Sequence, residues 1–380
     1  MSDFTFVFAI IIAIFCTTIF GKILSSLRFP HQIGDRIGHI DNLRGYLGLS
    51  VLFHHFIIWS NVKSGGAWEA PKIAFFNQLG KGSVAIFFMI TGFLFYPVIL
   101  SGFNNVSWKK FYTKRLFRIV PLLLFSIFSI SFIIYFLQGN TPNWRYPIEV
   151  ASWVSGRMSF NLLGFEESRF INAGVLWSIW YEWVFYIFVI PLMSVIRLFF
   201  RKKTIYLPLI SFVLSLIFRF SGIEIFQYLP LFFIGMISYE LKEMESVYTF
   251  MKSKTSSTIS IILMILSMTI FHDPYGIAMP MIGFFFLSVS CGNSLFGLMN
   301  SRGSLVLGEC SYGIYLIHGI ILYLFFTEFY FQISPLLALP ALSVIVTAAT
   351  ATTYLMIEAP GIKAGSRLSK TMLRKLPDAV

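Results

Sequence analysis

The chain has 380 residues, of which 57% are hydrophobic and only 12% are charged, whereas a soluble domain carries about 25% charged residues. With a mean hydropathy of +0.77, it has too little polar surface to cover a water-soluble globule. The net charge of +12 favours basic cytoplasmic loops of a membrane protein over a nucleic-acid partner. The three cysteines have neither metal-ligand nor disulfide spacing, so no metal site is predicted.

Long apolar runs predict a polytopic helical bundle with about eleven spans. A spanning helix needs roughly 20 apolar residues, and a spanning sheet would alternate apolar and polar positions in a closed barrel. The runs here are continuous, which indicates helices. The predicted spans are 4–24, 43–60, 82–101, 118–137, 175–196, 205–220, 226–240, 258–271, 277–295, 305–327 and 335–357. Residues 148–165 are intermediate and are predicted to form an interfacial or half-membrane helix, and residues 1–380 are predicted to form a single all-α domain.

The first span, 4–24, decides the orientation. No Lys or Arg precedes it, and no small-residue cleavage site follows it, so we expect an uncleaved helix with its N-terminus outside. This choice places most of the 29 Lys and Arg residues in cytoplasmic segments, as the positive-inside rule requires. The basic tail, residues 361–380, is then cytoplasmic.

The segment 41–59 holds ionisable residues within a predicted span, and such residues are functional candidates because their burial in lipid is costly. Arg44 and His55 are eleven residues apart, which puts them about 20° from the same helix face and ~16 Å apart along the axis. We therefore expect them to line one face, with Arg44 near the cytoplasm and His55 deeper as a general base. His54 points elsewhere and is a packing candidate. The alternative is that Arg44 reaches the lipid headgroups and both histidines are packed polar residues.

Two arginines, Arg115 and Arg118, share a helix face at the cytoplasmic end of span 118–137. A guanidinium group donates paired hydrogen bonds to phosphate, so this pair suits a phosphate ligand as well as it suits a plain positive-inside anchor. For Lys109 and Lys110 we favour the anchor.

Span 175–196 carries one carboxylate, Glu182, about two turns inside its outer end. Ser178 lies on the same face at i−4, and the aromatic residues around it, Tyr186 among them, are the kind that stack on sugar rings. The alternatives are an ordinary interfacial aromatic belt and a carboxylate that only joins helices.

Later segments add weaker signals. Ser311, Tyr315 and His318 form one polar stripe, which can serve a site or bond neighbouring helices. Arg219 is another ionisable residue within a predicted span, and residues 272–276 (HDPYG) are predicted to form a turn. Thr91-Gly92 is predicted to permit close helix packing.

Taken in order, these segments resemble acyltransferase family 3, the integral-membrane acyltransferases of bacterial surface glycans. The family's early span opens with D-x-L-R-G and places a histidine ten residues beyond the arginine; here Asp41 to Gly45 and His55 match. Further matches, in chain order, are FFMITGFL for F-F-x-x-S-G-F-L (with Thr91 in place of serine), Arg115 to Pro121 for R-x-x-R-I-x-P, Leu176 to Tyr186 for L-W-S-x-x-x-E-x-x-F-Y, Leu307 to His318 for L-G-x-x-S-Y-x-x-Y-L-x-H, and Tyr354 to Pro360 for Y-x-x-x-E-x-P. The family's ten-helix core would cover about 41–360, so span 4–24 is an extra helix, and the chain resembles the stand-alone type without an esterase-like domain.

The resemblance implies a membrane-bound O-acetyltransferase of the bacterial inner membrane. The expected donor is acetyl-CoA from the cytoplasm, and the expected acceptor is a sugar hydroxyl, free or lipid-linked, in a surface polysaccharide such as O-antigen; membrane lipids would surround the bundle. On this hypothesis His55 and Glu182 are catalytic, Glu182 lying toward the outside to orient the sugar or polarise His55, and His55 either deprotonates the acceptor or carries the acyl group. The expected donor-phosphate ligands are Arg44, Arg115 and Arg118, and the expected substrate-contacting or supporting residues are Asp41, Ser178, Tyr186, Ser311 and His318.

Two other function classes stay open from the residues alone. A transporter or flippase of glycans or small anions would also have many spans and a few intramembrane charges, although it more often shows inverted repeats, and none is visible here. A structural or assembly protein would leave Arg44, His55 and Glu182 without a role.

Overall fold

The computed structural model describes residues 3–27, 29, 38–200, 203–329 and 333–374, and the regular structure of those residues is all helical. The predicted all-α class is therefore confirmed. The α-helices are α1 (Asp3–Ser26), α2 (Gly38–Lys63), α3 (Ala74–Ser101), α4 (Trp108–Gln138), α5 (Tyr146–Val154), α6 (Ser168–Ile171), α7 (Trp177–Val184), α8 (Ile190–Ile196), α9 (Tyr206–Phe218), α10 (Ile225–Lys242), α11 (Glu245–Met251), α12 (Lys254–Ile270), α13 (Met279–Ser290), α14 (Arg302–Glu309), α15 (Ser311–Glu328), α16 (Pro335–Thr353) and α17 (Ala359–Arg374). Between them lie the 3-10 helices η1 (Phe103–Asn105), η2 (Leu162–Gly164), η4 (Arg197–Phe200), η5 (Arg219–Ser221) and η6 (Leu298–Asn300), and the π-helical turns η3 (Phe185–Val189) and η7 (Tyr354–Glu358).

Six helical segments of the described residues are long and apolar enough to cross a membrane: Asp3–Ser26, Ala74–Ser101, Trp108–Gln138, Trp177–Phe200, Ser311–Glu328 and Pro335–Thr371. The count becomes seven if α11 and α12, which meet at 70°, form one broken span. The segments Tyr206–Ser221 and Met279–Ser290 are apolar but shorter. Eleven spans therefore stays a prediction.

Large apolar side chains cover much of the outer surface. Phe4, Phe15, Phe128, Phe132 and Phe188 are each more than half exposed. A soluble monomer rarely exposes apolar patches of this extent, whereas lipid chains accommodate them. The structure thus has the surface of a membrane protein.

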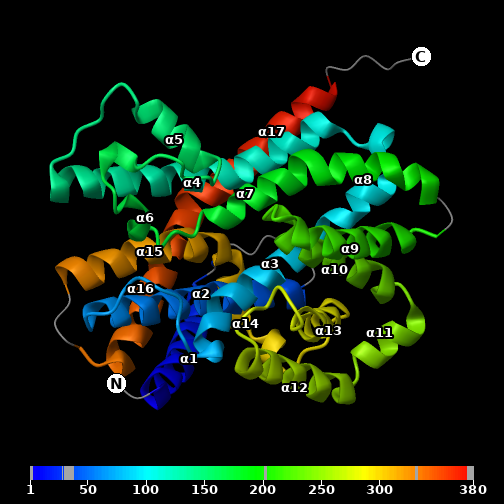
Figure 1. Ribbon diagram of the computed structural model, residues 1–380, viewed down its shortest axis with the longest axis horizontal. Coiled ribbons are helices and arrows are strands. Elements are labelled where there is room, and N and C mark those ends of the chain that lie inside the picture. Colours follow the sequence, from blue (N-terminus) through cyan, green and yellow to red (C-terminus); the bar gives the residue numbers. More distant parts are fainter. Residues whose placement is uncertain (1–2, 28, 30–37, 201–202, 330–332, 375–380) are drawn as a thin grey trace.

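Two segments have a secondary structure that the sequence did not predict. Residues 148–165 do not form one helix, because α5 ends at Val154 and Gly156 follows with a positive φ of 84°. The tail is helical as far as Arg374, since η7 joins α16 to α17 without a break. Figure 1 shows α17 alongside α4, and the two helices are in contact.

Glycines set how closely the central helices approach. A methyl group at Gly92 of α3 would overlap the carbonyl oxygen of Phe232 in α10, and one at Gly235 would overlap that of Met89. Neither helix could come this close with a side chain at these positions. The prediction that Gly92 permits close helix packing is confirmed.

Candidate active site

A first cavity of about 470 Å³ lies between α2, α3, α4, α7, α15 and α17. Eight of the predicted site residues line it: Asp41, Arg44, Arg115, Arg118, Ser178, Glu182, Tyr186 and Ser311. They come from α2, α4, α7, the π-helical turn η3 and α15, which bring together distant parts of the sequence. The C-terminal helix α17, which the sequence analysis treated only as a basic tail, adds Ile362 and Ser366 to the wall.

The wall of the first cavity is cationic. Arg44, Lys114, Arg115 and Arg118 line it together with only two carboxylates, Asp41 and Glu182. Asp41 lies 3.4 Å from Arg44, measured from Oδ1 to Nη1. This surplus of positive charge suits a ligand that carries several negative charges.

Aromatic and hydroxyl groups also line the wall of the first cavity. The Arg115 guanidinium lies 4.8 Å above the centre of the Phe95 ring, which fixes its orientation through a cation–π contact. The hydroxyl of Ser311 is buried and has no hydrogen-bond partner in the described structure, so it is free to bond a ligand in the cavity. Lys114 and Phe95, which the sequence did not indicate as site residues, also line this wall, and Phe95 of α3 meets Arg115 of α4 there.

Glu182 lies with the arginines and not beside His55, contrary to the expectation. Ser178 and Glu182 share one face of α7, as their spacing predicts, and this face is turned toward the first cavity. Tyr186, in the π-helical turn η3, donates to Glu182 Oε2 at 3.4 Å, and Tyr112 of α4 donates to the Tyr186 carbonyl at 3.2 Å. The contact between η3 and α4 and the packing of α7 against α3 thus decide the position of Glu182, and the sequence of α7 alone does not contain that information.

His55 lines a second cavity, of about 390 Å³, with Lys81, Trp177, Gln227, Tyr228 and Tyr275. Arg44 is absent from its wall, so Arg44 and His55 line different cavities. Between them, Gly48 of α2 packs against Ile314 of α15. The crossing of these helices separates the two parts of the face.

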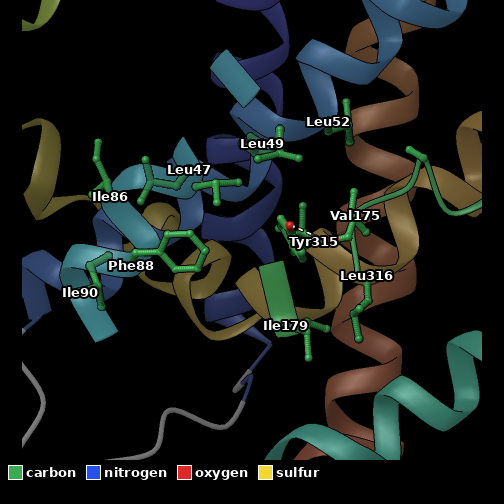
Figure 2. Close-up of a cluster of buried hydrophobic side chains, with 14 of the residues drawn as sticks. Leu47, Leu49, Leu52, Ile86, Phe88, Ile90, Val175, Ile179, Tyr315 and Leu316 are labelled. Carbon is green, nitrogen blue, oxygen red and sulfur yellow. Dashed lines mark hydrogen bonds between the residues drawn. The ribbon is translucent and has the colours of Figure 1, made fainter. Parts of the chain in front are cut away.

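Val84 and Tyr315 belong to the walls of both cavities, so the cavities meet at these two side chains. Figure 2 shows Tyr315 among buried apolar residues beside Val175. Its hydroxyl donates to the Val175 carbonyl at 2.8 Å and lies 2.7 Å from Ser178 Oγ. Because a carbonyl can only accept, the Ser178 hydroxyl donates to Tyr315. Two hydrogen bonds thus hold the phenol at the boundary.

The hydrogen bonds around His55 assign its tautomer. His318 Nδ1 lies 2.8 Å from the Ile314 carbonyl and must donate to it, which leaves His318 Nε2 as an acceptor in the neutral ring. His55 Nδ1 lies 3.1 Å from this Nε2 and 3.0 Å from the Val51 carbonyl. Both neighbours accept, so Nδ1 of His55 carries the proton and Nε2 has a free lone pair.

Trp68 is an aromatic neighbour of His55. Its ring is stacked at 6.5 Å from the imidazole, with 21° between the planes, while the His318 ring lies 5.1 Å away. His54 also lines the second cavity, and its Nδ1 bonds the Phe76 carbonyl at 2.9 Å. The neighbouring histidines differ in that a second imidazole, His318, also holds His55 Nδ1, so we take His55 as the potential base.

The structure thus defines an integral-membrane helical protein in which a cationic cavity meets a cavity that contains a basic imidazole. The family model described as "acyltransferase domain" matches residues 37–356, which is most of the chain. The chain belongs to this family, acyltransferase family 3, and is a membrane acyltransferase. No curated protein and no solved structure matches it significantly.

Proposed function

We propose that the chain transfers an acetyl group from acetyl-CoA in the first cavity to a sugar hydroxyl of a surface polysaccharide, such as O-antigen, in the second. The observation that carries this proposal is the meeting of the two cavities at Val84 and Tyr315. One cavity suits a polyanionic donor, and the other presents the free Nε2 of His55. A thioester needs to cross only this boundary to reach the base.

The donor's phosphates would lie on Arg44, Arg115 and Arg118. Arginine forks bond phosphate oxygens in pairs, and the hydroxyls of Ser311 and Ser366 are further donors in the wall. Lys370 of α17 is close enough to Lys114 to interact with its charge, which extends the positive field to the cavity mouth. Positive loops on this side support a donor that enters from the cytoplasm.

The transfer itself would need one base. His55 Nε2 takes the proton from the acceptor hydroxyl as the oxygen attacks the thioester carbonyl carbon. The carbon–sulfur bond breaks, the imidazolium returns its proton to the leaving thiolate, and the products are the sugar acetate and free CoA. In the alternative route Nε2 carries the acetyl group; protein that retains label from acetyl-CoA without acceptor would indicate that route.

Glu182 receives a different role from the one expected. It lies within electrostatic reach of Arg44, Arg115 and Arg118, so we propose that it positions these arginines for the phosphates. Asp41, which is paired with Arg44, would do the same. Neither carboxylate lines the cavity that holds His55.

The proposed topology has about eleven spans, with the N-terminus outside and the C-terminus in the cytoplasm of a bacterial inner membrane. The charge distribution supports this orientation. The orientation would put the cationic cavity, with α17 at its wall, on the cytoplasmic side. Labelling of single cysteines introduced at Lys72 and Lys363 with a membrane-impermeant maleimide, on intact and on opened cells, tests it.

An assay of purified protein in nanodiscs tests the function directly. With radiolabelled acetyl-CoA and extracted surface glycan, we expect alkali-labile label on the glycan and release of free CoA. Mass spectrometry of surface glycans from cells with and without the gene should show a difference of one acetyl unit on the acceptor. Substrate movement without any loss of thioester would instead identify a transporter.

Blocking the boundary is expected to stop transfer while the donor still binds. Val84 is 4% exposed and faces both cavities, so Val84→Trp would fill the passage. We expect kcat to fall at least about 100-fold with the dissociation constant of acetyl-CoA changed less than about threefold. Val84→Ile, which adds one methylene, is the matched control, and unchanged kcat in the tryptophan variant would place the route elsewhere.

His318 is expected to position His55 through the 3.1 Å contact between their nitrogens. His318→Ala should lower kcat about 10–100-fold and leave both KM values unchanged, because the substrates do not touch this ring. His318→Gln should recover most of the activity, since its amide oxygen can accept from His55 Nδ1 in place of Nε2. A rise of KM without loss of kcat would show that His318 binds substrate instead.

A further inference from the structure

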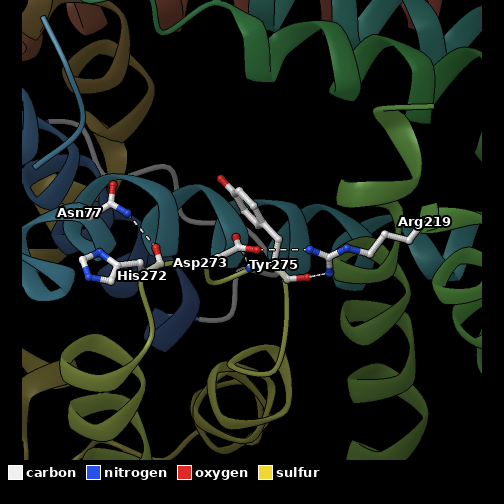
Figure 3. A network of polar contacts seen from close by, with 5 residues as sticks. All are labelled: Asn77, Arg219, His272, Asp273 and Tyr275. Carbon is white, nitrogen blue, oxygen red and sulfur yellow. Dashed lines mark hydrogen bonds and ion pairs between the residues drawn. The ribbon is translucent and has the colours of Figure 1, made fainter. Parts of the chain in front are cut away.

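The loop between α12 and α13, residues 271–278, has no part in the transfer steps, yet its backbone is held firmly. From α3, Asn77 Nδ2 donates to the His272 carbonyl at 2.7 Å, as Figure 3 shows. The next residue of α3, Gln78, donates through Nε2 to the Phe271 carbonyl, also at 2.7 Å. One end of the loop is thus attached to the helix that carries Val84.

The other end of the loop is held by Arg219, an ionisable residue for which the sequence indicated no role. Its Nη1 donates to the Tyr275 carbonyl, and its Nη2 lies 3.2 Å from Asp273 Oδ2 (Figure 3). Asp273 Oδ1 in turn accepts from the Tyr275 backbone nitrogen at 3.0 Å. A charged pair and several hydrogen bonds therefore hold one residue, Tyr275, in place.

The side chain of Tyr275 lines the second cavity. It is 3% exposed, and its hydroxyl has no hydrogen-bond partner in the described structure. A buried hydroxyl without a partner is unfavourable, and a ligand in the cavity would supply one. Tyr228 packs edge-on against the Tyr275 ring at 5.0 Å, and Trp177 lies 5.2 Å from Tyr228, so aromatic faces suited to a sugar ring stand beside the free hydroxyl.

The charge of the second cavity is also one-sided. Lys81 lines it and makes no ion pair with a described carboxylate, and no carboxylate is among the described residues of the wall. Two acids that act electrostatically on Tyr228 of this wall are engaged elsewhere, Asp273 with Arg219 and Glu224 with the Tyr181 hydroxyl at 3.0 Å. A lysine that faces a cavity without a carboxylate partner suits a ligand that brings the negative charge.

We propose that the second cavity binds an acceptor sugar that carries a negative charge, a uronate or a sugar phosphate, through Lys81 and the Tyr275 hydroxyl. This inference rests on the proposed function, because it identifies the class of acceptor for the same transfer. The sugar ring lies against Trp177 and Tyr228, its charged group is at Lys81, and a free hydroxyl faces His55. The loop 271–278 is then the element that selects the acceptor.

Binding and transfer are measured side by side on the full chain in nanodiscs. The anionic probes are methyl glucuronide, methyl galacturonide and glucose 1-phosphate, and the neutral probes are methyl glucoside and methyl galactoside. Binding is followed by saturation-transfer NMR and transfer by radiolabelled acetyl-CoA. The variants are Lys81→Met, which removes the charge and keeps an unbranched side chain one atom shorter, and Tyr275→Phe, which removes one oxygen atom. Lys72→Met, at an exposed lysine that lines neither cavity, is the control.

We expect the wild type to bind at least one anionic probe about tenfold or more tightly than its neutral counterpart. Lys81→Met should remove this preference, Tyr275→Phe should weaken charged and neutral sugars alike, and Lys72→Met should change neither. Whether uronates or the sugar phosphate respond to Lys81→Met separates the two sources of charge.

Two contrary results have different meanings. Equal binding of charged and neutral sugars by the wild type, or a preference that survives Lys81→Met, overturns the anionic acceptor even if acetyl transfer is observed. Lys81-dependent binding of an anionic sugar with no acetylation of any probe or of extracted glycan overturns the acetyl transfer and leaves a site for anionic sugars.

Discussion

Replacing His55 with alanine is expected to lower kcat for acetyl transfer by about 10²–10⁴-fold, the range that a general base contributes. The free lone pair on Nε2 is the group that is lost, since Nδ1 is committed to the Val51 carbonyl and His318. The KM for acetyl-CoA should stay within about twofold, because His55 does not line the first cavity. Steady-state kinetics on protein in nanodiscs give both constants.

His54, the residue before His55, provides the control for this variant. His54 lines the same cavity, but His318 does not contact it; its Nδ1 bonds the Phe76 carbonyl, and His54→Gln retains a hydrogen-bond donor there. We expect this variant to keep at least about a tenth of the wild-type kcat. Full transfer by His55→Ala, with an unchanged elution profile in detergent to show that it is folded, would remove His55 from the chemistry.

The second large effect concerns the donor. The double variant Arg115→Gln and Arg118→Gln is expected to raise the KM for acetyl-CoA by about 100-fold or more. Each hydrogen bond between a charged donor and a phosphate contributes about 1.5–3 kcal/mol, and a factor of ten corresponds to about 1.4 kcal/mol. The kcat at saturating donor should change much less, because neither arginine lies in the cavity of the base.

Two lysines on the same helix are the matched control. Lys109→Gln with Lys110→Gln removes the same charge from α4, but neither residue lines the first cavity. We expect a change in KM below about threefold, as for a membrane-surface anchor. Inhibition by adenosine 3′,5′-bisphosphate should weaken in the arginine variant and not in the lysine variant; equal effects in the two would mean that only the general field of the helix matters.

These two experiments also test the two-cavity arrangement together. Loss of the base should appear in kcat, and loss of the arginines should appear in the KM for the donor. If the two cavities acted as one site, both variants would change both constants. The separation follows from the crossing of α2 and α15 at Gly48 and Ile314, which no property of α2 alone predicts.

Much of the candidate site follows from local spacing. Ser178 and Glu182 at i and i+4, and Arg115 and Arg118 at i and i+3, do share faces, and both faces line the first cavity. Local geometry decides which side chains of one helix lie together. The membrane class could also be predicted from the sequence, because the hydropathy of a segment depends on its composition and not on how the helices pack.

Contacts between distant segments could not be predicted in this way. His55 and His318 are 263 residues apart and meet within hydrogen-bond distance, and Tyr275 reaches the second cavity only because Arg219 and Asn77 hold its loop. The polar stripe that contains His318 predicted which side of α15 is polar, but it did not predict that His55 of α2 would contact it. Such pairs depend on which helix docks on which.

The amino-acid sequence by itself determined that the chain is an all-helical membrane protein of the acyltransferase family, and which faces of its helices are polar. The reason is that helix formation, hydropathy and i, i+4 spacing depend on neighbouring residues. Only the tertiary structure decided that Arg44 and His55 line two cavities and that Glu182 belongs with the arginines. Those placements depend on the crossing of helices and on close approaches such as that at Gly92 and Phe232, which are set by the packing of the whole bundle.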